Sequence, residues 1–142
     1  MAEAVYAKAV YAIDAQPVVA FIKREPHWQR IGDAFKAATN GEITLRLTTV
    51  NAGEVIMAAE RDFGAIVAHR TLESIQQWTT IVDVDLELAA RASWFKLRGG
   101  ISYADCFAAA LAHRDGVPLI TGDPEFRRIE DVVRIAWLDS FG

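Results

Sequence analysis

Four carboxylates occupy positions in this sequence where they could bind a metal ion together. Each one follows a predicted strand or opens a predicted helix: Asp14, Glu54, Asp105 and Asp123. Carboxylates held about 4 Å apart repel each other by roughly 1 to 4 kcal/mol, so their convergence requires a compensating cation. Mg²⁺ and Mn²⁺ prefer carboxylate oxygen and water as ligands. We therefore predict that the four acids share Mg²⁺ or Mn²⁺.

A metal site of this kind suits the hydrolysis of a phosphodiester. The ion would bind a nonbridging phosphate oxygen, favour deprotonation of an attacking water and offset the charge on the leaving oxygen. The formal net charge of the chain is -4, so no global basic field attracts a nucleic acid. A local basic patch would therefore have to bind the nucleic acid together with the metal. The candidate residues are Lys96, Arg98, Arg127 and Arg128.

Each acid also has a purely structural interpretation. Asp14 and Asp123 could be helix N-caps, and Pro124 follows at the favoured first helical position. The stretches NAGE (51–54) and SYAD (102–105) resemble capping boxes. Ser, Thr or Asn could cap the same helices without mutual repulsion, so four converging acids favour the metal site.

The elements that must position these acids alternate between strand and helix. Strands are predicted at residues 9–13, 42–50, 79–84 and 117–121 and near 132–137. Helices are predicted between Asp14 and Pro26 and at 28–38, 52–60, 66–78, 85–98 and 102–113, with a helical turn around Phe126. The apolar residues expected on the inner face of helix 66–78 are Ile66, Val67, Leu72, Ile75 and Trp78.

This alternation predicts an α/β fold in one domain spanning residues 1–142, with a parallel sheet of four to five strands covered on both faces. In such folds ligands bind at the carboxyl ends of the strands, near the point where the strand order reverses.

The composition indicates where in the cell the protein is expected and which other residues could have a functional role. Cys106 is the only cysteine, which fits a reducing compartment, and we expect a cytoplasmic protein. Charged residues interrupt the apolar N-terminus, and no uncharged stretch approaches the roughly 20 residues of a membrane span, so no membrane association is expected. The three histidines have no metal-ligand spacing, and the four tryptophans are interpreted as core or interface residues.

The acidic motifs also carry a resemblance to a known family. The chain resembles PIN-domain ribonucleases, specifically the VapC-type toxins of bacterial and archaeal toxin–antitoxin modules, over nearly its whole length. The residues that carry it are Asp14 after an apolar strand, TTVNAGEV with Glu54, ISYADCFAAALA with Asp105, and LITGDPEFRRIE with Asp123.

The resemblance implies a three-layer α/β/α sandwich and an endoribonuclease whose four acids coordinate Mg²⁺ or Mn²⁺ directly or through water. It places Asn51, Ser102 and Thr121 in supporting positions around the acids. It also implies a homodimer and a small cognate antitoxin that inhibits the enzyme. The four basic residues could then contact RNA or the antitoxin. The chain departs from the family pattern after Asp14, where Ala15 replaces the usual Ser or Thr.

Other functions are considered beside this one. Phosphatases similar to the haloacid dehalogenases need a second Asp two residues after the first, and Gln16 stands there. Receiver domains need paired acids after the first strand. A PIN-like module that binds RNA or protein without cleaving it is the non-enzymatic alternative, and Ala15 and the net acidity favour it.

Overall fold

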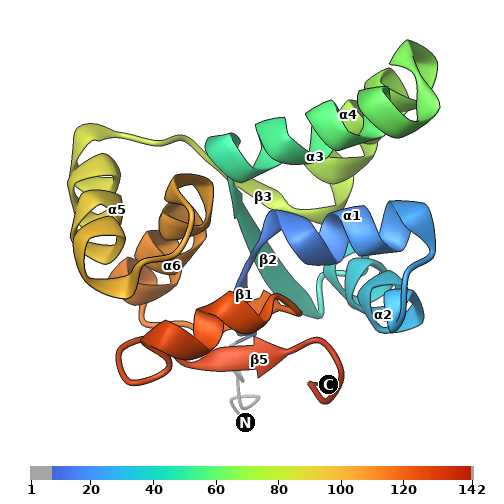
Figure 1. Cartoon of the computed structure of the whole chain (residues 1–142). Coiled ribbons are helices and arrows are strands. Elements are labelled where there is room, and N and C mark those ends of the chain that lie inside the picture. Colours follow the sequence, from blue (N-terminus) through green and yellow to red (C-terminus); the bar gives the residue numbers. More distant parts are fainter. Residues whose placement is uncertain (1–7, 142) are drawn as a thin grey trace, which may run out of the picture.

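The centre of the molecule is a parallel sheet, seen in a computed structural model that describes residues 8–141 (Figure 1). Within these residues the sheet has five strands in the order β3-β2-β1-β4-β5, and every neighbouring pair is parallel. The strands are β1 (Ala9–Ile13), β2 (Ile43–Thr48), β3 (Thr80–Val82), β4 (Leu119–Thr121) and β5 (Ile135–Trp137). The predicted parallel sheet is confirmed. The predicted domain, 1–142, reaches beyond the described residues at both ends.

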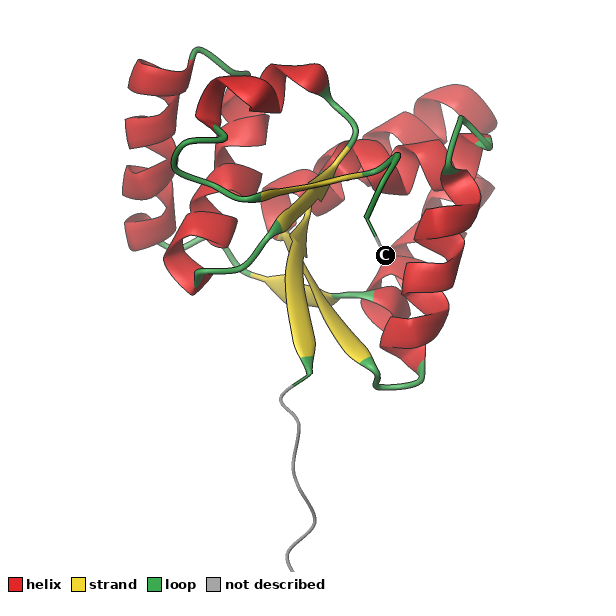
Figure 2. Ribbon diagram, turned by 90° about the horizontal axis from the view of Figure 1, so that it is seen from below, coloured by secondary structure: helices red, strands yellow, loops and turns green. Residues whose placement is uncertain are grey.

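Helices cover both faces of this sheet. They are α1 (Ala15–Lys23), α2 (Trp28–Thr39), α3 (Thr49–Phe63), α4 (Ala65–Trp78), α5 (Leu86–Gly99), α6 (Tyr103–Asp115) and the 3₁₀ helix η1 (Pro124–Ile129). Figure 2 shows the strands between two groups of helices. Side chains alternate between the faces of a strand. Ala12 and Leu119 accordingly pack in the core with α5 and α6, whereas Ile13 and Ile120 pack with α1 and α2. The expected α/β/α sandwich is therefore confirmed.

The strand order reverses between β1 and β4. From β1 the chain moves outward through β2 to β3, and it then crosses by α5 and α6 to β4 on the other side of β1. Ile13 pairs with Ile120, and the N–H of Asp14 continues the ladder by donating to the Ile120 carbonyl at 3.1 Å. The carboxyl ends of β1 and β4 therefore border the crevice where ligands bind in open α/β sheets.

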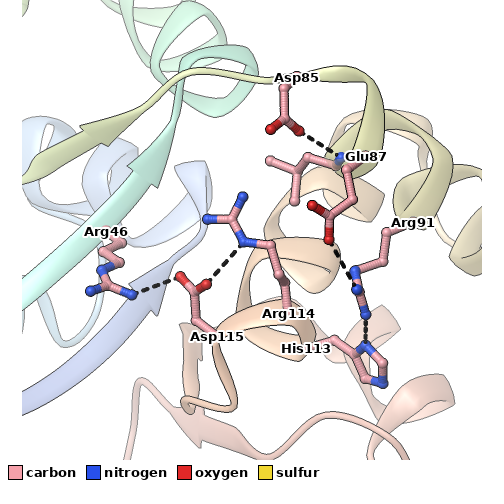
Figure 3. Close-up of polar contacts among 8 residues, drawn as sticks. Arg46, Asp85, Glu87, Arg91, His113, Arg114 and Asp115 are labelled. Carbon is pink, nitrogen blue, oxygen red and sulfur yellow. Dashed lines mark hydrogen bonds and ion pairs between the residues drawn. The ribbon is translucent and has the colours of Figure 1, made fainter.

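Helix α6 is anchored at the end opposite its first turn (Figure 3). Asp115, its last residue, accepts a hydrogen bond from Arg46 of β2 at 2.8 Å and another from Arg114 at 2.9 Å. Arg91 of α5 bonds to Nδ1 of His113 at 2.8 Å. Although burial opposes it, pairing with the two arginines lowers the pKa of Asp115. These contacts fix the helix that carries Asp105 in its first turn.

Four of the five predicted strands are shorter in the structure. The strand expected at 42–50 ends at Thr48, whose Oγ1 accepts a hydrogen bond from the N–H of Asn51 at 3.1 Å. Thr48 is thus the N-cap of α3, and Asn51 lies inside that helix. The strand expected near 132–137 begins only at Ile135, because Val133 donates its N–H back to Ile129 in the turn after η1. The strands expected at 79–84 and 117–121 are also shorter, and they span Thr80–Val82 and Leu119–Thr121.

The predicted inner face of helix 66–78 is wrong for two residues. Ile66 is 72% exposed and Leu72 is 40% exposed, whereas Ala68, Thr71 and Ile75 are buried. Ile66 lies nine residues before Ile75, and at about 3.6 residues per turn this places the two on opposite sides of the helix. None of the helices in residues 8–141 combines the length and apolarity that crossing a bilayer requires.

Candidate active site

All four predicted acids line one cavity at the carboxyl edge of the sheet. This acidic cavity has a volume of about 300 Å³ and is lined by Asp14, Ala15, Gln16, Val19, Glu25, Glu54, Met57, Ala58, Arg61, Asp105 and Asp123. Carboxylate oxygens of Asp105, Asp123 and Glu125 lie within 4.8 Å of one another. At that separation two unit charges repel by about 1 to 3 kcal/mol at effective dielectric constants between bulk water and a protein surface.

Asp14 is the most deeply buried of these acids, with an exposed fraction of 1%. Its Oδ2 accepts a hydrogen bond from the Thr121 hydroxyl at 3.0 Å, whereas its buried Oδ1 has no hydrogen-bond partner among residues 8–141. Burial and then the charge of Asp105 raise the pKa of Asp14 well above its ordinary value, against the effect of the Thr121 bond. Asp14 makes no capping hydrogen bond to α1, so the interpretation of this acid as a simple N-cap is wrong.

Thr121 connects the first acid to the last. Its hydroxyl donates to Asp14 and accepts a hydrogen bond from the N–H of Asp123 at 3.1 Å. Asp123 in turn accepts from the N–H of Glu125 at 2.9 Å and so caps η1, as one interpretation of the sequence predicted. The same carboxylate caps a helix and lines the acidic cavity, so the two interpretations of Asp123 are compatible.

The side chain of Asn51 connects Glu54 to the start of the helix that carries Asp105. Its buried amide donates to Oε1 of Glu54 at 3.0 Å and to the carbonyl of Ala104 at 3.1 Å, while Oδ1 accepts from the Thr48 hydroxyl at 2.6 Å. The interpretation of Asn51 as a helix cap is therefore wrong. Its side chain joins α3 to the start of α6, and this fixes the spacing between Glu54 and Asp105.

Asp105 lies in the first turn of α6. The hydroxyl of Ser102 accepts a hydrogen bond from its N–H at 3.2 Å, so Ser102 is the N-cap, as its position in SYAD predicted. A helix N-terminus favours a negative charge. Burial nevertheless raises the pKa of Asp105 to about 6; the Ser102 hydrogen bond opposes this, and the charges of Asp123, Glu54 and Glu125 add to it. An ionised Asp105 is thus held in unfavourable surroundings unless a cation is near.

The site also contains polar residues that were not predicted from the sequence. Arg61 lies seven residues after Glu54 on α3, so helical spacing places both on one face, and this signal could have found it. Glu125 lies two residues after Asp123 in the predicted turn. Glu25 lies in the connection between α1 and α2, outside the acidic motifs, and no pattern marks it.

The four predicted basic residues lie outside the lining of the acidic cavity, to which Arg61 is the only basic residue contributed by the described part of the chain. Lys96 and Arg128 each donate to a backbone carbonyl of the turn between α5 and α6, both at 2.9 Å. Arg98, near the end of α5, lies over the ring of Trp94. The structure therefore gathers three of the four near the turn that leads into α6. Arg127 instead lines a neighbouring cavity.

The side chains at this edge fit a hard divalent cation. They offer carboxylate oxygens, which Mg²⁺ and Mn²⁺ prefer, and one of those oxygens, Oδ1 of Asp14, is buried without a partner. Buried polar atoms in folded proteins are nearly always satisfied, and an exception indicates a functional group or an ion.

Comparison with known proteins agrees with this geometry. The family model of the PIN domain matches residues 11–132, a range that contains all four predicted acids. The chain belongs to the PIN domain family. No curated protein sequence matches it.

Solved structures share the fold of this PIN domain at low sequence identity. VapBC-1 from nontypeable Haemophilus influenzae has a TM-score of 0.68 and 18% identity, covering 92% of this chain and 99% of that one. VapC20 from Mycobacterium tuberculosis, a Sarcin-Ricin loop cleaving toxin, has a TM-score of 0.67 and 15% identity, covering 84% and 94%. DNA-bound VapBC from Salmonella typhimurium has a TM-score of 0.64 and 18% identity, covering 92% and 98%.

The PIN domain departs from the expected pattern just after Asp14. Ala15 presents only a methyl group to the acidic cavity. Oε1 of Gln16 accepts a hydrogen bond from the N–H of Gly122 at 2.7 Å and so connects the start of α1 to the residue after β4. The side chain after the first acid is therefore apolar, and the next one spans the crevice.

Proposed function

We propose that this protein is an Mg²⁺- or Mn²⁺-dependent endoribonuclease that acts as the toxin of a type II toxin–antitoxin system. The observation that carries the proposal is the unpaired, buried Oδ1 of Asp14 in a cavity where acids from four separate elements meet. Membership of the PIN domain family and the fold shared with VapC toxins support it.

In this proposal the metal is held by Asp14, Glu54, Asp105 and Asp123, directly or through water. A bound Mg²⁺ or Mn²⁺ would supply charge neutralisation at the phosphate and a lowered pKa of the attacking water. The hydroxyl of Thr121 fixes the orientation of Asp14, and the Asn51 amide does the same for Glu54. Ser102 holds the turn that presents Asp105.

The substrate is proposed to be RNA, held by basic residues around the acidic cavity. Arg61 lies in its lining, paired with Asp62, and is the residue proposed to contact a phosphate there. Lys96, Arg98 and Arg128 lie near the turn that leads into α6, and Arg127 lies beside the crevice. Because such contacts release counterions, the affinity for RNA should fall as salt rises. The same cations would pair with acidic groups of an antitoxin.

The proposed partners are a small cognate antitoxin and a second copy of the chain. Met57, Phe63 and Ile66 are large apolar residues of α3 and α4 that are 49% to 72% exposed. Exposed apolar surface of this kind marks protein interfaces, and a homodimer would cover it. The single cysteine agrees with the proposed cytoplasmic location.

The test is RNA cleavage by the variants Asp14→Asn and Asp123→Asn in the presence of Mg²⁺ or Mn²⁺. Each should lose at least about 100-fold in rate, because groups that only support metal ligands already cost about 10- to 100-fold when removed. Asp131→Asn is the matched control, since Asp131 is exposed and outside the acidic cavity. Full activity of both variants would reject the site. If calorimetry detects binding of protein or RNA but no affinity for the metal, and the RNA stays intact in the cleavage assay, the non-cleaving module would be favoured.

A further inference from the structure

A second cavity lies beside the acidic one and shares part of its wall. This cavity has a volume of about 460 Å³, within the usual range for small-molecule sites. Gln16 and Glu25 line both cavities. A ligand group in the second cavity would therefore lie next to the carboxylates. We call it the Trp137 cavity, after the aromatic residue in its lining.

The wall shared by the two cavities is held rigidly. The hydrogen bond from the Gly122 N–H to Oε1 of Gln16 is 2.7 Å long, and a Cβ at position 122 would lie 2.9 Å from that oxygen. Only glycine fits there without displacing Gln16. The Nε2 amino group of Gln16 donates no hydrogen bond within residues 8–141, so it stays available to a ligand.

The connection between α1 and α2, which also lines the Trp137 cavity, has an unusual backbone. Arg24 and His27 have φ angles of 57° and 71°, in the left-handed region that non-glycine residues rarely adopt. The conformation is held by the Arg24 guanidinium, 4.1 Å from the centre of a Trp28 ring, and by the bond from the Glu25 N–H to Ala20. Such conformations cluster at ligand-binding sites.

Arg127 and Trp137 add flat surfaces for stacking to the lining of the cavity. The guanidinium of Arg127 lies over the ring of Trp137, 5.5 Å from its centre. The Trp137 Nε1–H donates to Glu130 at 3.4 Å, which helps to fix the indole. Proteins bind single-stranded nucleic acid by stacking bases on aromatic rings and arginine planes. Trp137, interpreted from sequence as a core or interface residue, is only partly buried and lines this cavity.

We propose that the Trp137 cavity binds the base of the nucleotide next to the cleaved phosphate. This proposal rests on the proposed nuclease function, because the shared wall places the base beside the acids. The base stacks against Trp137 and Arg127, and the free amide hydrogens of Gln16 bond to its edge. Glu25 and Asp139, also in the lining, accept hydrogen bonds from an amino group, so adenine, cytosine and guanine are favoured over uracil.

Binding can be tested without cleavage. The uniformly ¹⁵N-labelled full chain is titrated with GMP, AMP, CMP and UMP in EDTA, and the indole signal of Trp137 is followed by NMR, with ribose 5-phosphate as the control without a base. We expect a saturable shift of this signal with GMP, AMP or CMP and a weaker one with UMP. Equal shifts with GMP and ribose 5-phosphate, or none with any nucleotide, would overturn the proposal.

Variants separate stacking from packing. Trp137→Phe keeps an aromatic face and should bind GMP nearly as well as the unchanged chain, whereas Trp137→Leu should bind about 10-fold more weakly. Arg127→Ala should also weaken binding, whereas Arg70→Ala removes the same charge from an exposed position on α4, outside both cavities, and should not. If Trp137→Leu does not fold, the affinities of Arg127→Ala and Gln16→Glu for GMP still test the base site, and both should be lower than that of the unchanged chain. Unchanged affinity in all variants would refute the base site.

The two proposals fail in different ways. If the unchanged chain cuts no RNA but the titration shows base-dependent shifts, the nuclease assignment is wrong and the base site stands. If RNA is cut but no nucleotide perturbs Trp137, the base site is wrong. A peptide that shifts the Trp137 signal while nucleotides do not would assign the cavity to a protein partner and overturn the proposal.

Discussion

Replacing Asp105 with asparagine should stabilise the metal-free protein. The Asp105 carboxylate is half-buried, and one of its oxygens lies within 4.8 Å of oxygens of Asp123 and Glu125. Each close pair at this distance repels by about 1 to 3 kcal/mol. Because the group is partly exposed, solvent screening reduces the total, and we expect a gain of about 1 to 2 kcal/mol in the free energy of unfolding at pH 8. Asparagine keeps the size of the side chain and the backbone bond to Ser102.

The gain should depend on pH in a defined direction. Burial, opposed by Ser102 and aided by neighbouring acids, raises the pKa of folded Asp105 to about 6 from an ordinary value of 3.8. The folded state therefore binds this proton more tightly than the unfolded state. The resulting stability is fully present below about pH 4 and is lost as the pH rises through about 6. Asparagine cannot ionise, so the variant escapes this loss. The difference between the two proteins should be small at pH 4.5 and largest at pH 8.

Urea denaturation in EDTA at pH 4.5 and pH 8 measures this difference. Repeating the pH 8 series with Mg²⁺ should reverse the order, because a ligand that binds only the folded state stabilises the unchanged chain more than a variant lacking one of its ligands. Asp131→Asn, an exposed acid elsewhere on the chain, controls for the loss of one negative charge. If Asp105→Asn is less stable than the unchanged chain at pH 8 in EDTA, or gains equally at both pH values, the reasoning is refuted.

Two further substitutions test the supports of the site and of the core. Asn51→Ala should cost about 1 to 3 kcal/mol in the free energy of unfolding, because it removes the acceptor of the buried Thr48 hydroxyl, and it should weaken Mn²⁺ affinity in calorimetry. Gln76→Ala, which removes an exposed bond, should do neither. Phe35→Ala should cost about 3 to 5 kcal/mol in urea denaturation, because this buried ring stacks on Trp78 at 4.3 Å. A loss below 1 kcal/mol would contradict the assigned packing.

The type of each element could be predicted from local patterns. Apolar strands, amphipathic helices and their punctuation identified the parallel sheet, because these signals act over a few residues. The acids could be proposed for the same reason, since Asp14, Asp105 and Asp123 each stand at a junction between elements. The predicted ends of helices and strands were less accurate where two neighbouring residues could both act as the helix cap. Thr48 and Asn51 could both cap α3, and only the tertiary contact of Asn51 with Ala104 decides between them.

Tertiary structure decided which side chains share a surface. Arg127 and Arg128 are adjacent in sequence, yet one lines the Trp137 cavity and the other bonds to the turn before α6. Glu25 joins the acidic cavity only because α1 brings its C-terminal connection back beside the sheet edge. Leu72 lies three residues before the buried Ile75, on the same side of α4, yet it is 40% exposed, so its spacing alone did not decide its burial. A periodic pattern determines which residues of a helix lie on one face, whereas the neighbouring elements determine whether that face is covered.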